Sequence, residues 1–493
     1  MNKRLVRTLA ILTFCFTFTL LSAQETITIE DVIARARAQS PFAKQAETRK
    51  ENRYWSYRSF KTNLNPQLRL RGQAPTYSKV VEAVTQPDGT IQYRPVEQTA
   101  NSLSLGLIQP LHWTGAVISA NTGLNYFKNY NAAASPGSGE LWSGSVMNIQ
   151  IDQPLFAYNT LKWQRKIEPL LFEESKREYV ENMESISEEA SDRFFRVLQE
   201  QINLQIASFN MANNDTIYKI EQGRYNIGTT SQDKLLQVEL QLLTSRQAIA
   251  QANLNLETAR LQLRTYLGLK DGDELPQLIM PENVPVFEVR MDDALEYAKK
   301  NRAAFISFER QRLQAESALA QAKGNRFQTN ISAAYGLNNN GLVMNDVYDN
   351  PLEQQQVNVT FSIPILDWGR NRSMMKSAIA NKKLTDYIIA QSEVTFEQDI
   401  MTLVRQFELL KLQLEITKKS DEVAAERYNV AQNRYLIGKI DITNLNIALK
   451  EKDDAKRGYI AALQAFWGSY YRLRRLTLFD FVTRTQLYMD TEG

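Results

Sequence analysis

The sequence is poor in cysteine and histidine, and this scarcity excludes whole classes of active site. Its 493 residues include one cysteine, Cys15, and one histidine, His112. Histidine-based zinc sites, Cys–His pairs and Ser–His–Asp triads need more of these residues than the chain contains, and a single cysteine cannot form an intramolecular disulfide. We therefore expect no enzymatic activity, no catalytic residues, no metal and no cofactor.

Neither sign of charge is in excess. The chain has 58 basic and 55 acidic residues, and three of the basic ones, Lys3, Arg4 and Arg7, lie within the first 23 positions. The remaining residues therefore balance at 55 of each sign. A nucleic-acid-binding protein would show a basic patch, so we expect no nucleic-acid partner.

Long apolar runs are confined to the N-terminus. Leu9 to Leu21 follow the three basic residues just named and precede the small and polar residues SAQET. This order is that of a secretory signal peptide, which we place at residues 1–23 with cleavage after Ala23. Cys15 leaves a lipoprotein as an alternative, but Phe14 precedes it where a lipobox has a small side chain.

One arrangement of motifs occurs twice in the chain. Residues 223–237 read GRYNIGTTSQDKLLQ and residues 433–447 read NRYLIGKIDITNLNI, so an Arg-Tyr-x-Ile-Gly corner recurs after 210 positions. Similar acidic helix starts, ITIEDVIARARAQSP and VRMDDALEYAKKNRA, open the two halves. Such self-similarity predicts an internal duplication. The predicted divisions are a first repeat at 24–268, a Pro-rich and acidic linker at 269–288, a second repeat at 289–476 and a C-terminal tail at 477–493.

Each half consists mainly of unusually long segments with the periodicity of helices. Each repeat combines two shorter helices with one long helix, and the short ones together match the long one at roughly 100 Å, with 1.5 Å per residue. In the helix after the first corner, large and small residues alternate in steps of three and four, as in a coiled coil. A periplasmic coiled-coil scaffold would explain these patterns equally well. The predicted helices are 30–63, 158–226 and 231–268 in the first repeat, and 291–325, 371–436 and 441–475 in the second.

Two inserts between the helices have the alternation of strands instead. Beyond residue 24 the chain has no run of about eighteen apolar residues, and membrane strands give a much weaker signal. Within 66–156 and 327–366, apolar residues alternate with uncharged Ser, Asn, Gln and Gly, and aromatic residues gather near the segment ends. We predict membrane strands there, which must close into a barrel shared by several chains because unpaired backbone groups in lipid are costly. Outward-facing loops are predicted at 78–98, 129–142 and 338–355.

Several motifs at the junctions resemble a known family. They are DQPLF at 152–156 and SIPILDWGRNRSMMKSAIANK at 362–382, where strands pass into long helices, both corners, and the terminal YYRLRRLTLFDF at 470–481. With these motifs in this order, the mature chain resembles the TolC family of outer membrane efflux proteins. The resemblance implies a mainly α protein with membrane β-strands. Three chains would share one β-barrel joined to a long periplasmic α-helical barrel, built as a coiled-coil cylinder.

The resemblance also implies a function and partners. The chain would be a homotrimeric channel in contact with outer membrane lipid, extending into the periplasm of a Gram-negative cell. It would be the exit duct of a tripartite efflux or type I secretion system, passively conducting substrate delivered by a periplasmic adaptor (membrane fusion) protein and an inner-membrane RND or ABC transporter. A periplasmic coiled-coil adaptor or scaffold protein without a membrane barrel is the alternative. The substrate and the choice between RND and ABC partners stay open.

By this resemblance the two corners are the periplasmic tips of helical hairpins, at 226–231 and 436–441. Both glycines stand where a left-handed residue ends a helix, and Ser231 and Asp441 stand where the next helix needs an N-cap. The tips would also contact the adaptor. The residues expected to do so are Arg224, Tyr225, Gly228, Ser231, Leu235, Arg434, Gly438, Asp441 and Leu445.

The same tips would form the constriction that closes the channel. In well-known members of the family, aspartates lie six and nine positions after the glycine of the second corner, and an arginine lies two positions after it. Here these positions hold Asn444, Ile447 and Ile440, whereas Tyr435 matches a tyrosine of the family's locking network. We therefore expect a constriction of Tyr435, Asn444 and Ile447 that is closed more by packing than by charge.

The number of strands departs from the family pattern of two per half. The first insert has room for four strands, at 66–77, 101–110, 116–127 and 145–154. The extra strands within 101–127 could widen the barrel, lie against its rim or fold on the periplasmic side. The sequence does not decide between these three places.

Overall fold

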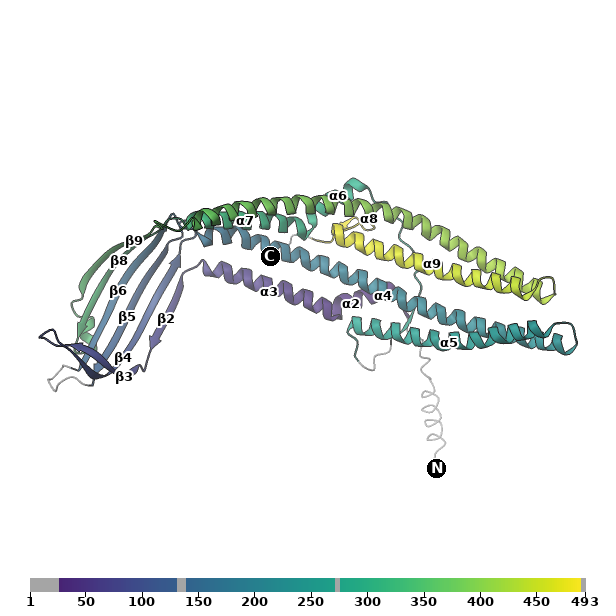
Figure 1. Cartoon of the computed structure of the whole chain (residues 1–493), viewed down its shortest axis with the longest axis horizontal. Coiled ribbons are helices and arrows are strands. Elements are labelled where there is room, and N and C mark those ends of the chain that lie inside the picture. Colours follow the sequence, from purple (N-terminus) through teal and green to yellow (C-terminus); the bar gives the residue numbers. More distant parts are fainter. Residues whose placement is uncertain (1–25, 131–138, 271–274, 489–493) are drawn as a thin grey trace, which may run out of the picture. The chain divides into compact units, whose positions relative to one another are not determined.

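Two helices of equal length, one in each half of the sequence, organise the structure. The computed structural model describes residues 26–130, 139–270 and 275–488, so the expected signal peptide lies outside the described residues. The long helices α4 (Thr160–Asn226) and α8 (Arg370–Leu436) have 67 residues each. Each turns a corner into a helix of 36 residues, α5 (Gln232–Leu267) or α9 (Ile442–Thr477). With strands preceding α4 and α8 (Figure 1), this order confirms the internal duplication.

The chain divides into two units. The first comprises residues 1–49, 177–302 and 396–493, and the second comprises residues 50–176 and 303–395. Both corners belong to the first unit, and the large sheet belongs to the second. No helix in the described ranges is both long enough and apolar enough to cross a membrane.

The first helix of each half is broken, although one continuous helix was predicted in each case. Residues 30–63 form α2 (Ile29–Gln39) and α3 (Pro41–Asn63), and residues 291–325 form α6 (Met291–Asn301) and α7 (Ala303–Gly324). Ser40 is extended because the proline that follows it disfavours helical dihedrals. In the second half Arg302 adopts the same extended conformation without a proline.

Seven strands form one antiparallel sheet in the second unit (Figure 1). The sheet order is β2-β4-β5-β6-β8-β9, and β3 pairs with the part of β4 that β2 leaves free. The extra strands expected within 101–127 therefore lie inside the sheet, between β2 and β6. The strands are β2 (Gln67–Gln73), β3 (Tyr77–Thr85), β4 (Ile91–Pro110), β5 (Val117–Asn129), β6 (Glu140–Leu155), β8 (Gln328–Gly341) and β9 (Leu352–Ser362).

The loop predicted at 78–98 is wrong, and the loop predicted at 338–355 is shorter than expected. Residues 78–98 form a hairpin of β3 and the first half of β4, paired from Tyr77 with Thr99 to Thr85 with Ile91. Charged residues such as Lys79 and Glu97, which form a cross-strand ion pair of 2.8 Å, obscured the alternation that marks strands. β8 and β9 both extend into 338–355, with a short 3₁₀ helix η1 (Met344–Val347) between them. The loop predicted at 129–142 lies largely outside the described residues.

The strands of the main sheet share one apolar face. The register places Leu105 of β4 opposite Leu70 of β2 and Thr122 of β5, and Ala120 of β5 opposite Ile149 of β6. Side chains on the other face are mainly Ser, Asn, Gln and Gly. The apolar face carries Leu68, Leu70, Leu103, Leu105, Leu107, Ile118, Ala120, Leu124, Met147, Ile149, Ile151, Ile331, Ala333, Tyr335, Val357, Val359 and Phe361.

A buried ion-pair network stabilises the first unit away from the corners. Glu184 of α4 is fully buried and accepts hydrogen bonds from Arg37 of α2 and Arg474 of α9. Arg474 also donates to Asp480 of β10 (Phe479–Asp480), which pairs with β11 (Thr485–Gln486). Burial alone would lower the pKa of Arg474, but Glu184 outweighs it and raises the pKa. A short parallel pair, β1 (Thr26–Ile27) and β7 (Gln277–Leu278), completes this unit.

Candidate functional site: the two hairpin corners

The two corners have the same backbone geometry. Gly228 and Gly438 both have φ of 75°, in the left-handed region, and no atom lies within 4 Å of a Cβ built on either glycine. The backbone conformation, not crowding, therefore requires glycine at these positions. In each corner the glycine N–H donates to the carbonyl of the corner tyrosine at 2.9 Å, and the next residue donates to the corner arginine at 2.8 Å.

The helix after each corner begins at the expected N-cap residue, but only one side chain caps it. Asp441 accepts a hydrogen bond from the backbone N–H of Asn444 at 2.9 Å. Ser231 has the extended N-cap backbone, yet its hydroxyl makes no capping hydrogen bond. The second corner is therefore the more firmly capped of the two.

Equivalent residues of the two corners differ in burial. Tyr435 is 3% exposed, whereas its counterpart Tyr225 is 41% exposed. Leu445 is likewise buried, whereas its counterpart Leu235 is half-buried. Tyr435 lies in an apolar cluster drawn from all four helices of the two hairpins, which packs the corners against each other. The other buried members are Ile217, Val238, Tyr428, Ile442, Leu445, Ala448 and Leu449.

Three hydrogen-bonded polar residues lie beside this apolar cluster. They are Tyr435, Glu221 and Arg224, and we call them the tip triad. The Tyr435 hydroxyl donates to Oε1 of Glu221 at 2.8 Å, and Arg224 donates to the same oxygen at 2.7 Å. The Arg224 guanidinium also lies 5.4 Å from the centre of the Tyr435 ring. Glu221 is 4% exposed, so both donors compensate a carboxylate that is almost excluded from water.

The pKa values of Glu221 and Tyr435 follow from this geometry. Burial alone would raise the pKa of Glu221, but the hydrogen bonds from Tyr435, Arg224 and Thr230 outweigh it and hold the pKa below its usual value. Burial, followed by the hydrogen bond to Glu221, raises the pKa of Tyr435. At neutral pH the triad therefore consists of a carboxylate with a neutral hydroxyl and a guanidinium as donors.

The sequence analysis singled out Tyr435 and Arg224 but missed Glu221. The repeat supplied no signal for it, because the residue 210 positions later is Ala431. Glu221 lies one helical turn before Tyr225 of its own corner, whereas the tyrosine that binds it, Tyr435, belongs to the other hairpin.

The three residues expected to form the constriction do not share one surface. Asn444 and Ile447 lie one turn apart on the exposed face of α9, with Ile447 45% exposed. The Asn444 amide donates to its own cap, Asp441, at 2.8 Å. Tyr435, by contrast, points into the cluster between the hairpins.

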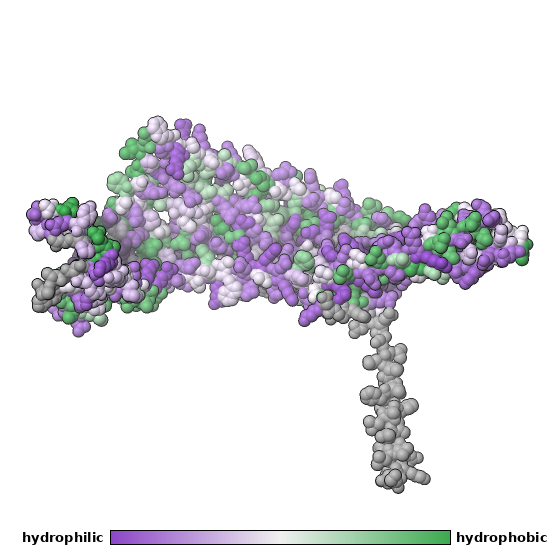
Figure 2. Space-filling view, turned by 60° about the horizontal axis from the view of Figure 1, so that its bottom comes forward, coloured by the Kyte–Doolittle hydropathy of each residue, from purple (hydrophilic) through white to green (hydrophobic). Residues whose placement is uncertain are grey.

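The residues expected to contact an adaptor also divide by exposure. Tyr225, Ser231, Arg434 and both glycines are exposed, and Ile227 and Ile437 add exposed apolar side chains beside them. Hydrophobic residues gather at this end of the hairpins (Figure 2). Arg224 is held within the tip triad, and Leu445 is fully packed.

Helices α5 and α8 each carry an apolar stripe with no partner among the residues that the structure describes. On α5 the stripe lies opposite the heptad seam predicted from the sequence, whose residues, such as Val238, Leu242 and Leu256, are buried against the chain's own helices. Steps of three, four or multiples of seven separate most neighbours within each stripe, so each stripe occupies one side of its helix. The exposed residues are Leu236, Leu240, Leu243, Leu254 and Leu261 on α5, and Leu409, Leu412, Ile416, Val423 and Val430 on α8.

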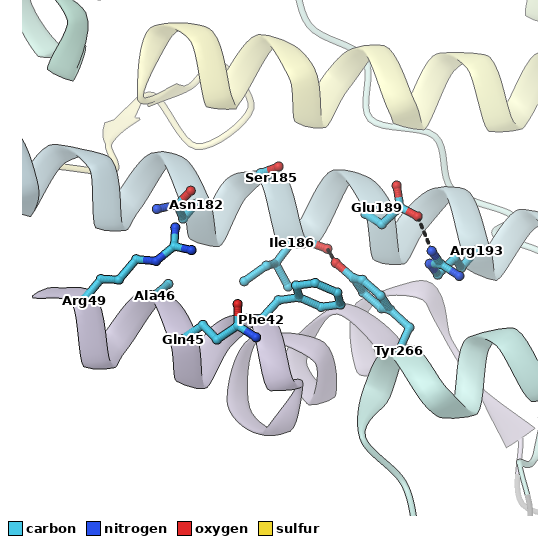
Figure 3. A pocket seen from close by; sticks show the side chains of 10 residues that line it. All are labelled: Phe42, Gln45, Ala46, Arg49, Asn182, Ser185, Ile186, Glu189, Arg193 and Tyr266. Carbon is cyan, nitrogen blue, oxygen red and sulfur yellow. Dashed lines mark hydrogen bonds and ion pairs between the residues drawn. The ribbon is translucent and has the colours of Figure 1, made fainter.

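A cavity of about 480 Å³ lies further along the hairpin, between α3, α4 and α5 (Figure 3). The Tyr266 hydroxyl donates to the carbonyl of Ile186 at 3.2 Å. Arg193 pairs with Glu189 at 2.7 Å and lies over the Tyr266 ring. Of the Arg193 guanidinium, the group that pairs with Glu189 is satisfied, whereas Nε is buried without a hydrogen-bond partner among the described residues. In the part of the chain that the structure describes, no group of three or more His, Cys, Asp or Glu residues could hold a metal ion.

The chain is similar in sequence to one protein family and in fold to solved outer membrane channels. The protein-family model described as "Outer membrane efflux protein" matches residues 118–269 and 294–477. A search of curated protein sequences finds no match.

Solved structures that resemble the chain include three outer membrane proteins. The CmeC outer membrane channel of Campylobacter jejuni gives a TM-score of 0.65 at 14% identity, covering 91% of this chain and 85% of that one. The outer membrane protein VceC of Vibrio cholerae gives 0.62 at 13% identity, covering 91% and 95%. The MtrE outer membrane channel of Neisseria gonorrhoeae, in its open state, gives 0.60 at 13% identity, covering 91% and 88%.

The family match spans two segments, one in each half of the duplicated sequence, and together they make up more than half of the chain. With the helices and the sheet arranged as in known outer membrane channels, the chain belongs to the outer membrane efflux protein family and is a channel of the outer membrane that extends into the periplasm.

Proposed function

We propose that three copies of this chain form the exit duct of a tripartite efflux or type I secretion system. The duct passively conducts substrate that a periplasmic adaptor (membrane fusion) protein and an inner-membrane RND or ABC transporter deliver. The observation that carries the proposal is the pair of closed hairpin corners, together with the unpartnered apolar stripes beside them on α5 and α8.

The stripes support a homotrimer because they complement each other. α5 runs away from its corner and α8 runs toward its own, so α5 of one copy and α8 of the next pair as antiparallel helices with the corners level. The stripe from Leu236 to Leu261 on α5 then faces the stripe from Leu409 to Val430 on α8 along most of α5. Burying one leucine side chain contributes about 2 kcal/mol, so each stripe provides a substantial driving force for association.

The tip triad supports a channel that is closed at rest. The hydrogen bond from Tyr435 of the second hairpin to Glu221 of the first holds the two together, and Arg224, on the same helix as Glu221, lies over the Tyr435 ring. In this conformation Asn444 and Ile447 remain on the free face of α9, where three copies can meet at the axis. In the proposed mechanism, Tyr435 acts as a lock within each protomer, and Asn444 and Ile447 line the constriction.

Adaptor docking is proposed for the exposed residues of both corners. Tyr225, Ile227, Arg434 and Ile437 combine apolar and cationic side chains at a helix turn. Aromatic residues and arginine commonly dominate the energetics of protein interfaces.

The test uses the mature protein purified from membranes in detergent. We expect it to fractionate with the outer membrane, to migrate on a gel as a trimer that heating dissociates, and to show low conductance in a planar bilayer. A water-soluble monomer that needs no detergent would contradict both the trimer and the duct.

A further inference from the structure

The first half of the chain supplies one strand hairpin more than the second. Within the described ranges, the second half contributes β8 and β9 to the main sheet, whereas β2, β4, β5 and β6 come from the first half. The main sheet of each copy therefore has six strands across its width, with β2 and β9 as its two edges.

We propose that three copies close a barrel of eighteen strands, in which the β4–β5 hairpin is part of the wall. This inference rests on the proposed trimer. Edge strand β9 of one copy pairs with edge strand β2 of the next. β2 leads away from α3 and β9 leads into α8, so these edges meet as antiparallel strands, like every other neighbouring pair in the sheet.

The distribution of apolar side chains on the β4–β5 hairpin is the one expected of strands in the barrel wall. Leu103, Leu105 and Leu107 of β4 continue the apolar face from β2, and Ile118 and Ala120 of β5 continue it to β6. A hairpin that folded away from the wall would expose this face to water and leave β2 and β6 without their observed partners.

The base of this hairpin is fixed to the helices that flank it. Gln109 donates to the carbonyl of Leu64, just after α3, at 2.9 Å. Asn159, just before α4, donates to the carbonyl of His112 at 2.9 Å. The turn at 111–116 is therefore held at the junction between sheet and helices, which a strand pair in the wall requires.

The arc of barrel wall that six strands of one copy would cover also matches the arc covered by the helices of that copy. Six strands 4.8 Å apart and tilted by about 40° cover an arc of roughly 38 Å per copy, whereas four strands cover roughly 25 Å. The four helices that join the sheet, α3, α4, α7 and α8, cover roughly 38 Å at an interaxial distance of about 9.5 Å. Eighteen strands would give a barrel about 36 Å across, compared with about 24 Å for twelve, so the sheet would not narrow the duct.

Spin labels on single cysteines test the position of the hairpin. The mature chain is free of cysteine once residues 1–23 are removed. Leu105→Cys and Ala120→Cys probe the apolar face of the hairpin, Ser104→Cys and Asn121→Cys probe its polar face, and Ile149→Cys and Val359→Cys are references in β6 and β9. Each labelled trimer is reconstituted in phospholipid vesicles, and its collisions with oxygen and with a water-soluble nickel chelate are compared.

We expect the labels at 105 and 120 to prefer oxygen as strongly as those at 149 and 359, and the labels at 104 and 121 to prefer the chelate. Labels at 105 and 120 that prefer the chelate, with 149 and 359 still in lipid, would overturn the eighteen-stranded wall and leave the channel function intact. If 149 and 359 also prefer the chelate, the membrane assignment itself fails. A strand count in an electron-microscopy map of the trimer in nanodiscs is the independent check, with eighteen expected and twelve contradicting the inference.

Discussion

Glu221 accepts two hydrogen bonds while nearly excluded from water, so its protonation state determines how strongly the two hairpins are held together. The hydrogen bonds hold its pKa in the folded protein below the usual value. A group with a lowered folded pKa contributes stability that is fully present above its unfolded pKa, about 4.3 for Glu, and is lost as the pH falls through the folded value. The closed corner should therefore weaken only in acid.

Conductance measured against pH tests this role of Glu221. We expect single-channel conductance of the wild-type trimer to stay low at neutral pH and to rise as the pH falls below about 4. Glu221→Gln removes this titration, so its conductance should be higher at neutral pH and nearly independent of pH. Glu239→Gln, at an exposed position of α5, is the matched control. A wild-type acid response that persists in Glu221→Gln would assign the titration to another group.

Tyr435 is the second residue whose removal should open the corner. Tyr435→Phe keeps the ring in its apolar cluster but removes the hydrogen bond to Glu221, worth about 2 kcal/mol for a charged acceptor. This shifts the balance between closed and open forms about thirtyfold per protomer, and bilayer recordings should show more frequent openings. Tyr225→Phe, the equivalent change in the first corner, should have no such effect because Tyr225 is exposed. Equal openings in both variants would show that the hydrogen bond is not the lock.

At the scale of the element, α5 has two apolar sides, and only one of them has a partner in the described part of its own chain. Leu240→Glu places a charge in the unpartnered stripe, where each copy would lose about 2 kcal/mol of leucine burial and would also have to bury a carboxylate. We expect the heat-sensitive trimer to disappear from gels, while circular dichroism of the detergent-solubilised chain retains its helical signal. Gln237→Glu adds the same charge on an exposed polar side of α5 and should leave the trimer intact. A stable Leu240→Glu trimer would place the interface elsewhere.

The same helix shows what periodicity could predict. The heptad pattern identified the seam that packs within the chain, and α5 begins and ends within a residue of its predicted bounds. The second stripe was not recognised, because an apolar stripe facing a neighbouring copy has the same period as one facing the chain's own core. The break at Ser40 was marked by a proline, but the break at Arg302 has no local signal in the sequence. Glu221 was missed because Tyr435, one of its two donors, comes from the other hairpin.

At the scale of the whole molecule, the position of the narrowest point decides which residues control the flow of ions. Because the proposed barrel is wide and the corners are closed, the narrowest point of the channel should lie at the corners. Three charges at a constriction change the electrostatic potential across the full width of the channel there, because the low-dielectric protein walls focus the electric field. Three charges on a wall about 36 Å across are screened by ions at physiological salt, where the Debye length is about 8 Å.

A pair of matched substitutions tests this placement. Ile447→Asp puts three carboxylates beside the proposed constriction, and Asn358→Asp puts three on the polar face of β9, where residue 358 is exposed in the single chain. We expect Ile447→Asp to make the open channel clearly more selective for cations in a salt gradient, measured by the reversal potential, and Asn358→Asp to change it little. Both measurements are made in the Tyr435→Phe background, in which we expect the channel to open more often. A larger shift for Asn358→Asp than for Ile447→Asp would place the narrowest point within the sheet and would contradict a barrel wider than the corners.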